Sequence, residues 1–246
     1  MRTVLTRHPT GNYSFLPGDG SRPFCQAVVA DSGFEIVRAQ LQRPLEWRRG
    51  FDLVERHLDA AGRPRTALCS VELRCREPYT PDAFDAFNAR YAALLDGWGL
   101  FVDGLGSTTR TNVAPDVAAP SEQVLFAFAY TVPAAVGTPT FVISGAPERA
   151  QVRPGESSPA ALREKTADIV RQLTARFDAI GQSWPDATQV AVYTTHDALA
   201  AVRAELVPRL GPSALDALRW FFSRPPIVGL ELEIDARRLR QELRLT

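Results

Sequence analysis

Two arginines in this sequence are candidates for binding a small anion. Arg110 lies in the segment TTRTNVAP and Arg224 in FSRPPIVG, each after a loop and before β-branched residues. The rigid fork of guanidinium donors matches the two oxygens of a carboxylate. No acidic residue follows Arg110 within five positions, and Asn112 adds a neutral hydrogen-bonding group. We therefore expect Arg110 to hold a ligand carboxylate, with a structural ion pair as the alternative.

Other familiar catalytic patterns are missing from the chain. The three histidines lie far apart, with no HxxxH or CxxC spacing, so no metal site is expected. Cys69 and Cys75 fall on the apolar face of an expected strand, where a cysteine is more often a small buried side chain than a nucleophile. The chemistry predicted from the residues is therefore carboxylate binding.

The elements that must position these arginines occur twice along the chain. Residues 82–95, DAFDAFNARYAALL, align without gaps with residues 197–210, DALAAVRAELVPRL. A β-rich run precedes each block, and an amphipathic segment ending in glycine precedes each run. Each half thus reads strand, helix, strand, helix, strand. A segment rich in Pro, Gly and Ala at 133–139 marks the expected boundary, so we predict domains 1–135 and 136–246.

The pattern also predicts individual elements and their faces. In strand 66–76, Ser70, Glu72 and Arg74 alternate with apolar residues, which predicts one polar sheet face. Strands near 24–30 and 34–40 are expected to form a hairpin, and residues 235–246 resemble a helix more than a strand. Helices are expected near 46–61, 81–96, 159–180 and 197–210, and the remaining strands near 66–76, 110–117, 123–132, 140–145, 187–194 and 226–234.

Composition limits the classes of partner. Lys plus Arg and Asp plus Glu both number 28, so the net charge is zero, which argues against nucleic acid or an anionic membrane as partner. No apolar run approaches the roughly 18 residues that span a bilayer. The first residues have no hydrophobic signal core, and the three cysteines suit reduced thiols, so we expect a cytoplasmic protein.

The order of these motifs resembles the Rid family, also called YjgF or L-PSP endoribonuclease-like. GRPRTALCSVELR, DAFDAFNARYAALL and TRTNVAP follow one another as the family's strand, helix and arginine motifs do. In the second half, Phe141 to Gly145 (FVISG) is similar to the family's FVSG strand, and Arg224 falls on the same arginine. Gly11 to Ser14 (GNYS) resembles the family's N-terminal GPYS. The chain is similar to the family over nearly its whole length, as a tandem repeat of two copies.

This resemblance implies a fold and an activity. The fold would be α+β, two chorismate-mutase-like domains, each a mixed sheet with two helices on one face. Family members form trimers with ligand clefts between subunits and hydrolyse enamines or imines of amino acids, without a cofactor. By resemblance, Arg110 and Asn112 would be catalytic, Tyr13, Arg224 and Glu231 would bind substrate, and the protein would be a homotrimer with a small carboxylate as its ligand.

The sequence departs from the family at the position of an acidic residue. The family has a glutamate on the last strand of the domain, but the first half carries Phe128 or Ala129 there. Glu231 and Glu233 are expected on the strand of Arg224, too early for that role. Three functions therefore remain open from the sequence. They are a deaminase (hydrolase) acting on a small 2-imino carboxylate, a catalytically silent carboxylate-binding protein, and a chorismatase-like hydrolase.

Overall fold

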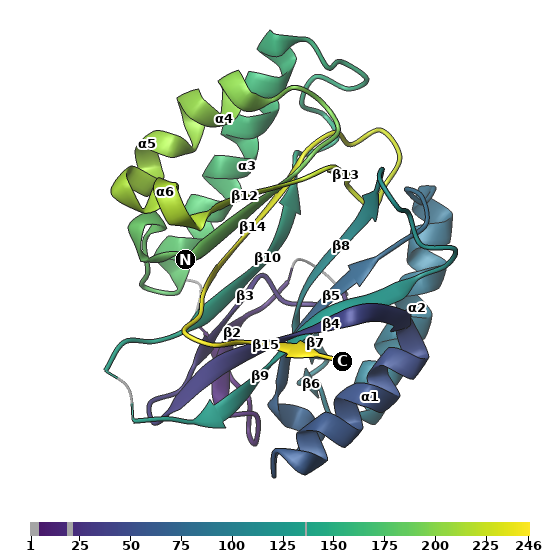
Figure 1. Cartoon of the computed structure of the whole chain (residues 1–246), viewed down its shortest axis with the longest axis vertical. Coiled ribbons are helices and arrows are strands. Elements are labelled where there is room, and N and C mark those ends of the chain that lie inside the picture. The colour runs from purple at the N-terminus through teal and green to yellow at the C-terminus, as the bar shows by residue number, and fades with distance from the viewer. Residues whose placement is uncertain (1–4, 19–21, 136) are drawn as a thin grey trace.

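Two β-sheets lie face to face between two layers of helices in the computed structural model (Figure 1). The structure describes residues 5–18, 22–135 and 137–246. The first sheet has the spatial order β1 (Thr6–Arg7), β2 (Tyr13–Leu16), β3 (Ala27–Ala30), β10 (Phe141–Pro147), β14 (Glu233–Arg238), β11 (Gln189–Tyr193), β12 (Leu218–Phe221). The second has the order β13 (Ser223–Arg224), β8 (Thr109–Pro115), β5 (Leu68–Arg74), β9 (Val124–Pro133), β4 (Phe34–Glu46), β15 (Glu242–Leu245). A small separate pair is formed by β6 (Phe101–Val102) and β7 (Leu105–Gly106).

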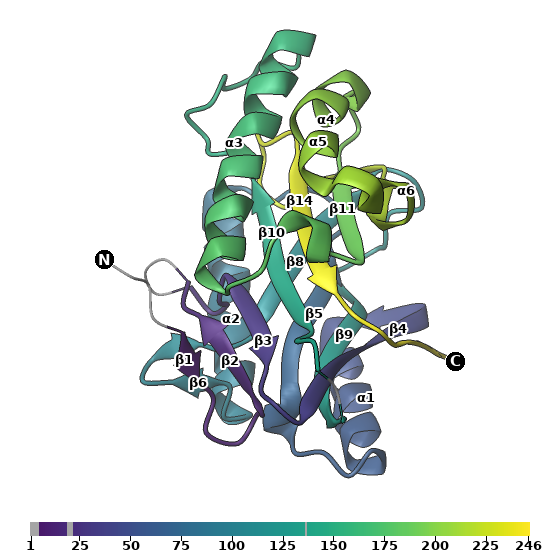
Figure 2. The same ribbon diagram turned by 90° about the vertical axis from the view of Figure 1, so that its left-hand side faces the viewer.

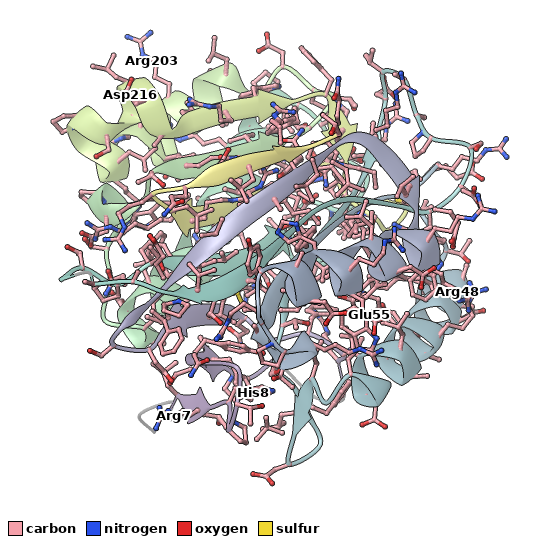
Figure 3. All side chains as sticks on the ribbon, turned by 60° about the horizontal axis from the view of Figure 1, so that its bottom comes forward. Arg7, His8, Arg48, Glu55, Arg203 and Asp216 are labelled. Atoms are coloured by element: carbon pink, nitrogen blue, oxygen red, sulfur yellow. The ribbon has the colours of Figure 1, made fainter. Side chains whose placement is uncertain are left out.

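Helices cover the outer face of each sheet. The second sheet is covered by α1 (Trp47–Ala60) and α2 (Pro81–Gly97). The long helix α3 (Pro159–Ala179) runs along the first sheet (Figure 2), beside the short helices α4 (Leu199–Glu205), α5 (Val207–Leu210) and α6 (Ala214–Ala217). Charged side chains such as Arg203 and Asp216 project outward from this layer (Figure 3). Within the described residues, no helix has the length and apolar character needed to cross a membrane.

Local sequence explains where the helices begin and end. The Thr80 and Ser158 hydroxyls each accept a hydrogen bond from a backbone amide of the first turn, and each is followed by a proline at the first helical position. Gly62 and Gly181 follow helix ends with φ of 65° and 66°, a conformation that favours glycine. These predicted helix boundaries are confirmed.

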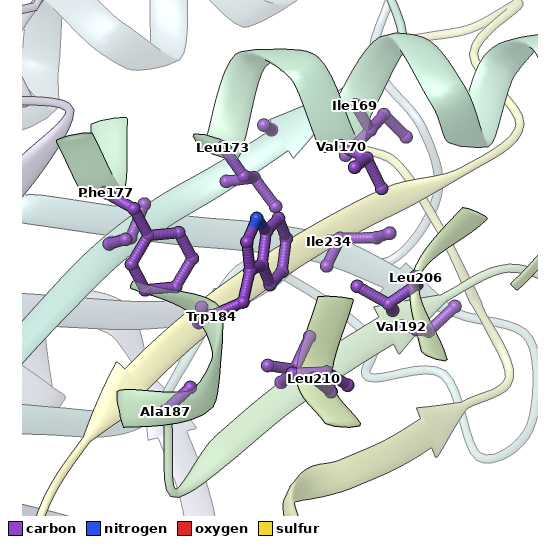
Figure 4. Close-up of a cluster of buried hydrophobic side chains, with 14 of the residues drawn as sticks. Ile169, Val170, Leu173, Phe177, Trp184, Ala187, Val192, Leu206, Leu210 and Ile234 are labelled. Atoms are coloured by element: carbon purple, nitrogen blue, oxygen red, sulfur yellow. The ribbon is translucent and has the colours of Figure 1, made fainter. Parts of the chain in front are cut away.

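Each sheet has its own apolar core under its helices. Leu173, Phe177 and Trp184 pack against Ile234 of the first sheet (Figure 4). In the second core, Phe51 of α1 packs with α2 and β9. Burying such side chains stabilises a fold by roughly 1.5–3 kcal/mol each. The two cores hold the facing sheets in place and leave a polar layer between them.

Ion pairs and hydrogen bonds fill this layer between the sheets. Glu72 accepts hydrogen bonds from Arg38 at 2.6 and 2.9 Å and pairs with Arg237 of the other sheet. The Thr111 hydroxyl donates to Asp235 at 2.8 Å, again from one sheet to the other. The predicted polar strand face is therefore covered by the facing sheet of the same chain.

The two halves share one strand topology. In the first half, β8, β5, β9 and β4 are neighbours in that order, with β5 and β8 parallel. In the second, β12, β11, β14 and β10 repeat the order, and β11 and β12 are parallel. The α+β class with mixed sheets is thus confirmed. However, β1 to β3 extend the sheet of the second half and β15 extends that of the first. Division into domains 1–135 and 136–246 stays a prediction, and residue 136 lies outside the described residues.

Three expectations about individual elements were wrong. The strands on either side of Gly33 do not form a hairpin, because β3 pairs with β2 and β10 while β4 pairs with β9 and β15. Ala27 and Val37 on these strands belong to different apolar cores, so the chain crosses between sheets at the turn. The expected helix 197–210 is divided at Leu206, since Pro208 has no amide hydrogen to continue it.

The third correction concerns the C-terminal segment. The strand expected at 226–234 instead begins at Glu233, because the chain first turns at Gly229, whose φ of 87° interrupts a strand and favours glycine. Residues expected to be helical form β14 and β15. On β14, Ile234 and Ala236 face the core, while the alternate charged residues face the polar layer. The charges of this segment therefore suit a strand between two sheets.

Candidate active site

A cavity of about 210 Å³ lies where the two halves meet. The strands β8 and β10 run side by side there (Figures 1 and 2), joined by a 3.0 Å hydrogen bond from the Arg110 amide to the Ser144 hydroxyl. A second cavity of about 730 Å³ adjoins it and shares Arg22 and Phe24 in its wall. The charged and polar side chains of the smaller cavity that could bind a ligand or transfer a proton include Arg110 and Asn112 of β8, Glu233 of β14, and Asn88 and Asp85 of α2.

Arg110 lies buried in an aromatic setting. Its guanidinium carbon is 4.2 Å from the centroid of the Phe24 ring and 5.1 Å from that of Tyr91. One terminal nitrogen donates to the Asn88 side-chain oxygen at 2.8 Å. Burial lowers the pKa of Arg110 to about 10, so the group stays charged at neutral pH. Among the described residues, no carboxylate lies within ion-pair distance of it. A buried charge without a counterion costs several kcal/mol, which favours an anionic ligand.

Asn112 presents a free donor at the same wall. Its side-chain oxygen accepts a hydrogen bond from Gln123 at 3.1 Å, which orients the amide. The amide nitrogen is buried and has no hydrogen-bond partner in the protein. Buried polar groups are nearly always satisfied, so this donor is available to a ligand. Arg110 and Asn112 together thus offer donors suited to one carboxylate.

Glu233 supplies an acid in this cavity. It is 3% exposed, and burial raises its pKa to about 8, helped by Asp235 and opposed by the charge of Arg110. At neutral pH the side chain is therefore mostly protonated. Its carboxyl group lies against Gly145, where an added Cβ atom would overlap it. Gly145 thus leaves the space that this carboxyl group occupies.

The other predicted site residues lie elsewhere, and their roles stay predictions. Tyr13 is fully buried, with its hydroxyl hydrogen-bonded to Ser107 at 3.0 Å. Arg224 pairs with Asp116 at 2.8 Å on the surface, and Glu231 bonds His196 at 2.6 Å. None of the three lines the described cavity around Arg110. In β12, the positions on the core side of the sheet, where Arg110 lies in β8, are Leu218 and Trp220, and Arg224 lies in β13 beyond them.

Sequence reasoning missed several charged and polar residues of the cavity, Glu233 and Arg22 among them. Glu233 was expected on the strand of Arg224, but it opens β14, which lies between β10 and β11 in the first sheet. The motif ELEID was therefore the available signal, hidden by the wrong strand boundary. Arg22 carries no motif, and only the folded chain brings it to the cavity.

The arrangement can bind an anion beside a proton donor. A carboxylate on Arg110 and Asn112 would place the adjoining carbon atoms in the cavity that Glu233 faces. A carboxylic acid with a pKa near the working pH is suited to give and take back a proton. In the described part of the chain, no group of three or more His, Cys, Asp or Glu side chains is placed to hold a metal ion.

Comparison with known proteins gives a matching family and a related deaminase. Residues 5–243 match the family described as 2-aminomuconate deaminase CnbZ. The 2-amino-5-chloromuconate deaminase of Comamonas testosteroni is 35% identical over 238 residues, covering 92% of this chain and 93% of that protein.

Two solved structures, among others, align with this chain. A chorismatase aligns with a TM-score of 0.51 at 13% identity, over 92% of this chain and 77% of that chain. A member of the YjgF/YER057c/UK114 family from Mycobacterium tuberculosis aligns with a TM-score of 0.32 at 16% identity, over 41% of this chain and 79% of that chain.

Proposed function

The chain belongs to the CnbZ family of 2-aminomuconate deaminases, and we propose that it releases ammonia from an unsaturated 2-amino dicarboxylate of the 2-aminomuconate type. One observation carries this proposal. A buried arginine without a carboxylate partner and a glutamic acid with a pKa of about 8 face one cavity. The relative from Comamonas testosteroni, named for deamination of a chlorinated 2-aminomuconate, supports the same class of reaction.

Arg110 and Asn112 hold the carboxylate next to the amino-bearing carbon. The guanidinium fork and the free Asn112 amide give charge-assisted and neutral hydrogen bonds to its oxygens. The rings of Phe24 and Tyr91 fix the guanidinium group and exclude water around it. This anchoring converts the reaction with water into a step within one ordered site.

Glu233 moves the protons of the reaction. The protonated acid first gives its proton to a carbon of the conjugated enamine, which becomes an iminium while Glu233 becomes a carboxylate. A water molecule then adds to the iminium carbon and loses a proton to Glu233. Glu233 returns this proton to the nitrogen, and the C–N bond breaks to release ammonia. The hydroxyl proton passes to Glu233 as the ketone forms, so the acid is regenerated and one water is consumed per ammonia.

The test is a deaminase assay with matched variants. We expect wild-type protein to release one ammonia per 2-aminomuconate consumed, measured by loss of diene absorbance and an ammonia-coupled reaction. Glu233→Gln should lower kcat by about 100-fold or more. Glu164→Gln is the control, since that carboxylate is exposed on α3 and does not line the cavity.

Two results would contradict the proposal. One is the absence of ammonia release by the wild type, and the other is a Glu233→Gln variant as active as the wild type. Chorismate in the same assay separates the alternatives. Its turnover without deaminase activity would favour a chorismatase-like hydrolase, and carboxylate binding without any turnover would favour a silent binding protein.

A further inference from the structure

Arg22 stands where the smaller and the larger cavity join, and it lines both of them. We propose that Arg22 binds the second carboxylate of the substrate, at the end away from the amino group, and so selects dicarboxylates over monocarboxylates. This inference rests on the proposed function, because it takes Arg110 as the anchor of the first carboxylate.

The two arginines are placed around one aromatic ring. The guanidinium carbon of Arg110 lies 4.2 Å from the centroid of Phe24, and that of Arg22 lies 5.9 Å from the same centroid. Their separation therefore cannot exceed the sum of these two distances. The positive charge of Arg22 also acts on Arg110, where it lowers the pKa of that group. Two cations thus share one small cavity.

This spacing suits a short diacid. The carboxyl carbons of an extended six-carbon diacid lie roughly 6 Å apart, since every two bonds advance the chain by about 2.5 Å. Each carboxylate can then reach one guanidinium group while the carbon chain lies along the Phe24 ring. A flat diene has the shape to stack on that ring.

The remaining charges nearby support Arg22 in this role. In the described part of the chain, no carboxylate lies within ion-pair distance of Arg22, although Asp85 lines the same cavity. Arg149 of the larger cavity is already held by Asp168, and Arg176 donates to the Ser144 carbonyl oxygen at 2.8 Å. Glu233 adds little negative charge at neutral pH because its pKa is about 8. Two like charges left together repel each other, and a bound dianion would relieve that repulsion.

The test compares two ligands that differ only at the distal end. Muconate has a carboxylate where sorbate has a methyl group, and both carry the same diene. Calorimetry should show that the wild type binds muconate at least about 10-fold more tightly than sorbate. Arg22→Ala should remove this preference by lowering the affinity for muconate and not that for sorbate. Arg22→Lys should keep part of the preference. Arg90→Ala, which removes an exposed arginine of α2 outside the cavity, should leave both affinities unchanged.

Other outcomes would overturn the inference. These are a preference for muconate that persists in Arg22→Ala, an equal loss of affinity for muconate and sorbate in that variant, or a wild type that binds neither ligand. Thermal melting of each variant checks that the fold is intact. Because binding is measured without turnover, failure of the proposed reaction would be seen separately, as absence of ammonia release by the wild type. If Arg149→Ala instead lost affinity for muconate and not for sorbate, the second carboxylate would bind in the larger cavity.

Discussion

Glu233 remains neutral at physiological pH although it shares a cavity with a cation. Loss of hydration raises its pKa more than the attraction of Arg110 lowers it, and Asp235 on the same strand face adds to the rise. A bound substrate carboxylate would neutralise Arg110 and so remove one of the opposing interactions. Substrate binding should therefore raise the pKa of Glu233 further and hold the proton that the first step uses.

The pH dependence of the reaction should show both forms of this acid. Glu233 must begin protonated, so kcat/KM should fall as the pH rises through about 8, the pKa in the free protein. In the substrate complex the pKa is higher, so kcat should begin to fall at a higher pH than kcat/KM. Steady-state rates from pH 4 to 10 would check this. A fall of kcat/KM toward low pH with a midpoint near 4.5 would mean that Glu233 starts as a carboxylate.

Gly145 should be needed for the position of this acid. Gly145→Ala would place a methyl group in the space of the Glu233 carboxyl group, while no backbone atom blocks it. The side chain must turn away, so we expect kcat to fall by about 100-fold, close to the loss of the acid itself. Gly97→Ala is the matched control, because nothing lies within 4 Å of the added atom. Near-normal activity of Gly145→Ala, with an unchanged melting temperature, would show that Glu233 takes no part in the reaction.

At the scale of elements, the regular segments could be predicted from the sequence and the crossings between sheets could not. Periodicity and capping residues locate α1, α2 and α3 because both signals are local. By contrast, β14 carries charges whose partners, such as Glu72, are distant in sequence. The same limit applies to the site. Arg110 and Asn112 belong to a local motif, whereas Glu233 and Arg22 reach the cavity only through the packing of the two halves.

The polar layer between the sheets should depend on Glu72. Burial alone would raise the pKa of Glu72, but Arg237 and Arg38 outweigh that effect and hold it well below its usual value. Glu72→Gln removes a buried counterion from Arg38 and Arg237, which keep only Glu242 and Asp235, so we expect the free energy of unfolding at pH 7 to fall by about 3 kcal/mol. Urea unfolding measures this change. Glu55→Gln, which loses only a partly exposed pair with Arg65, should cost at most about 1 kcal/mol.

The pH dependence of stability gives a second check on this pair. A carboxylate with a lowered folded-state pKa contributes stability above its unfolded pKa, near 4.5, and loses it as the pH falls below that value. The difference between wild type and Glu72→Gln should therefore shrink from pH 7 to pH 3. A difference that stays constant over this range would show that packing, not charge, explains the loss.

At the scale of the whole molecule, the cavity joins the two halves of one chain. The first half contributes Arg110 and Asn112, and the second contributes Glu233 and Gly145. The polar sheet face that carries Ser70, Glu72 and Arg74 is covered within the chain, by hydrogen bonds such as that from Thr111 to Asp235.

The homotrimer stays a prediction that rests on the family resemblance. Light scattering at micromolar concentration should give three times the chain mass of 27.0 kDa. A mass of one chain would contradict it, and would agree with a molecule whose polar sheet faces are already paired within the chain. Either result leaves the cavity described above intact, since all of its described lining residues come from one chain.

Separating the two halves should abolish both the fold and the activity. A cut between residues 135 and 136 would part β3 from β10 and β15 from β4, and would part Arg110 from Glu233. It would also expose the charged layer around Glu72, whose partner Arg237 lies beyond the cut. We therefore expect residues 1–135 or 136–246 alone to lack a cooperative unfolding transition and to release no ammonia, whereas co-expression of the two should restore part of the activity. Circular dichroism melting and the ammonia assay measure these outcomes. Cooperative unfolding and deaminase activity in either half alone would show that each half forms a complete domain, with its own site in place of the shared one.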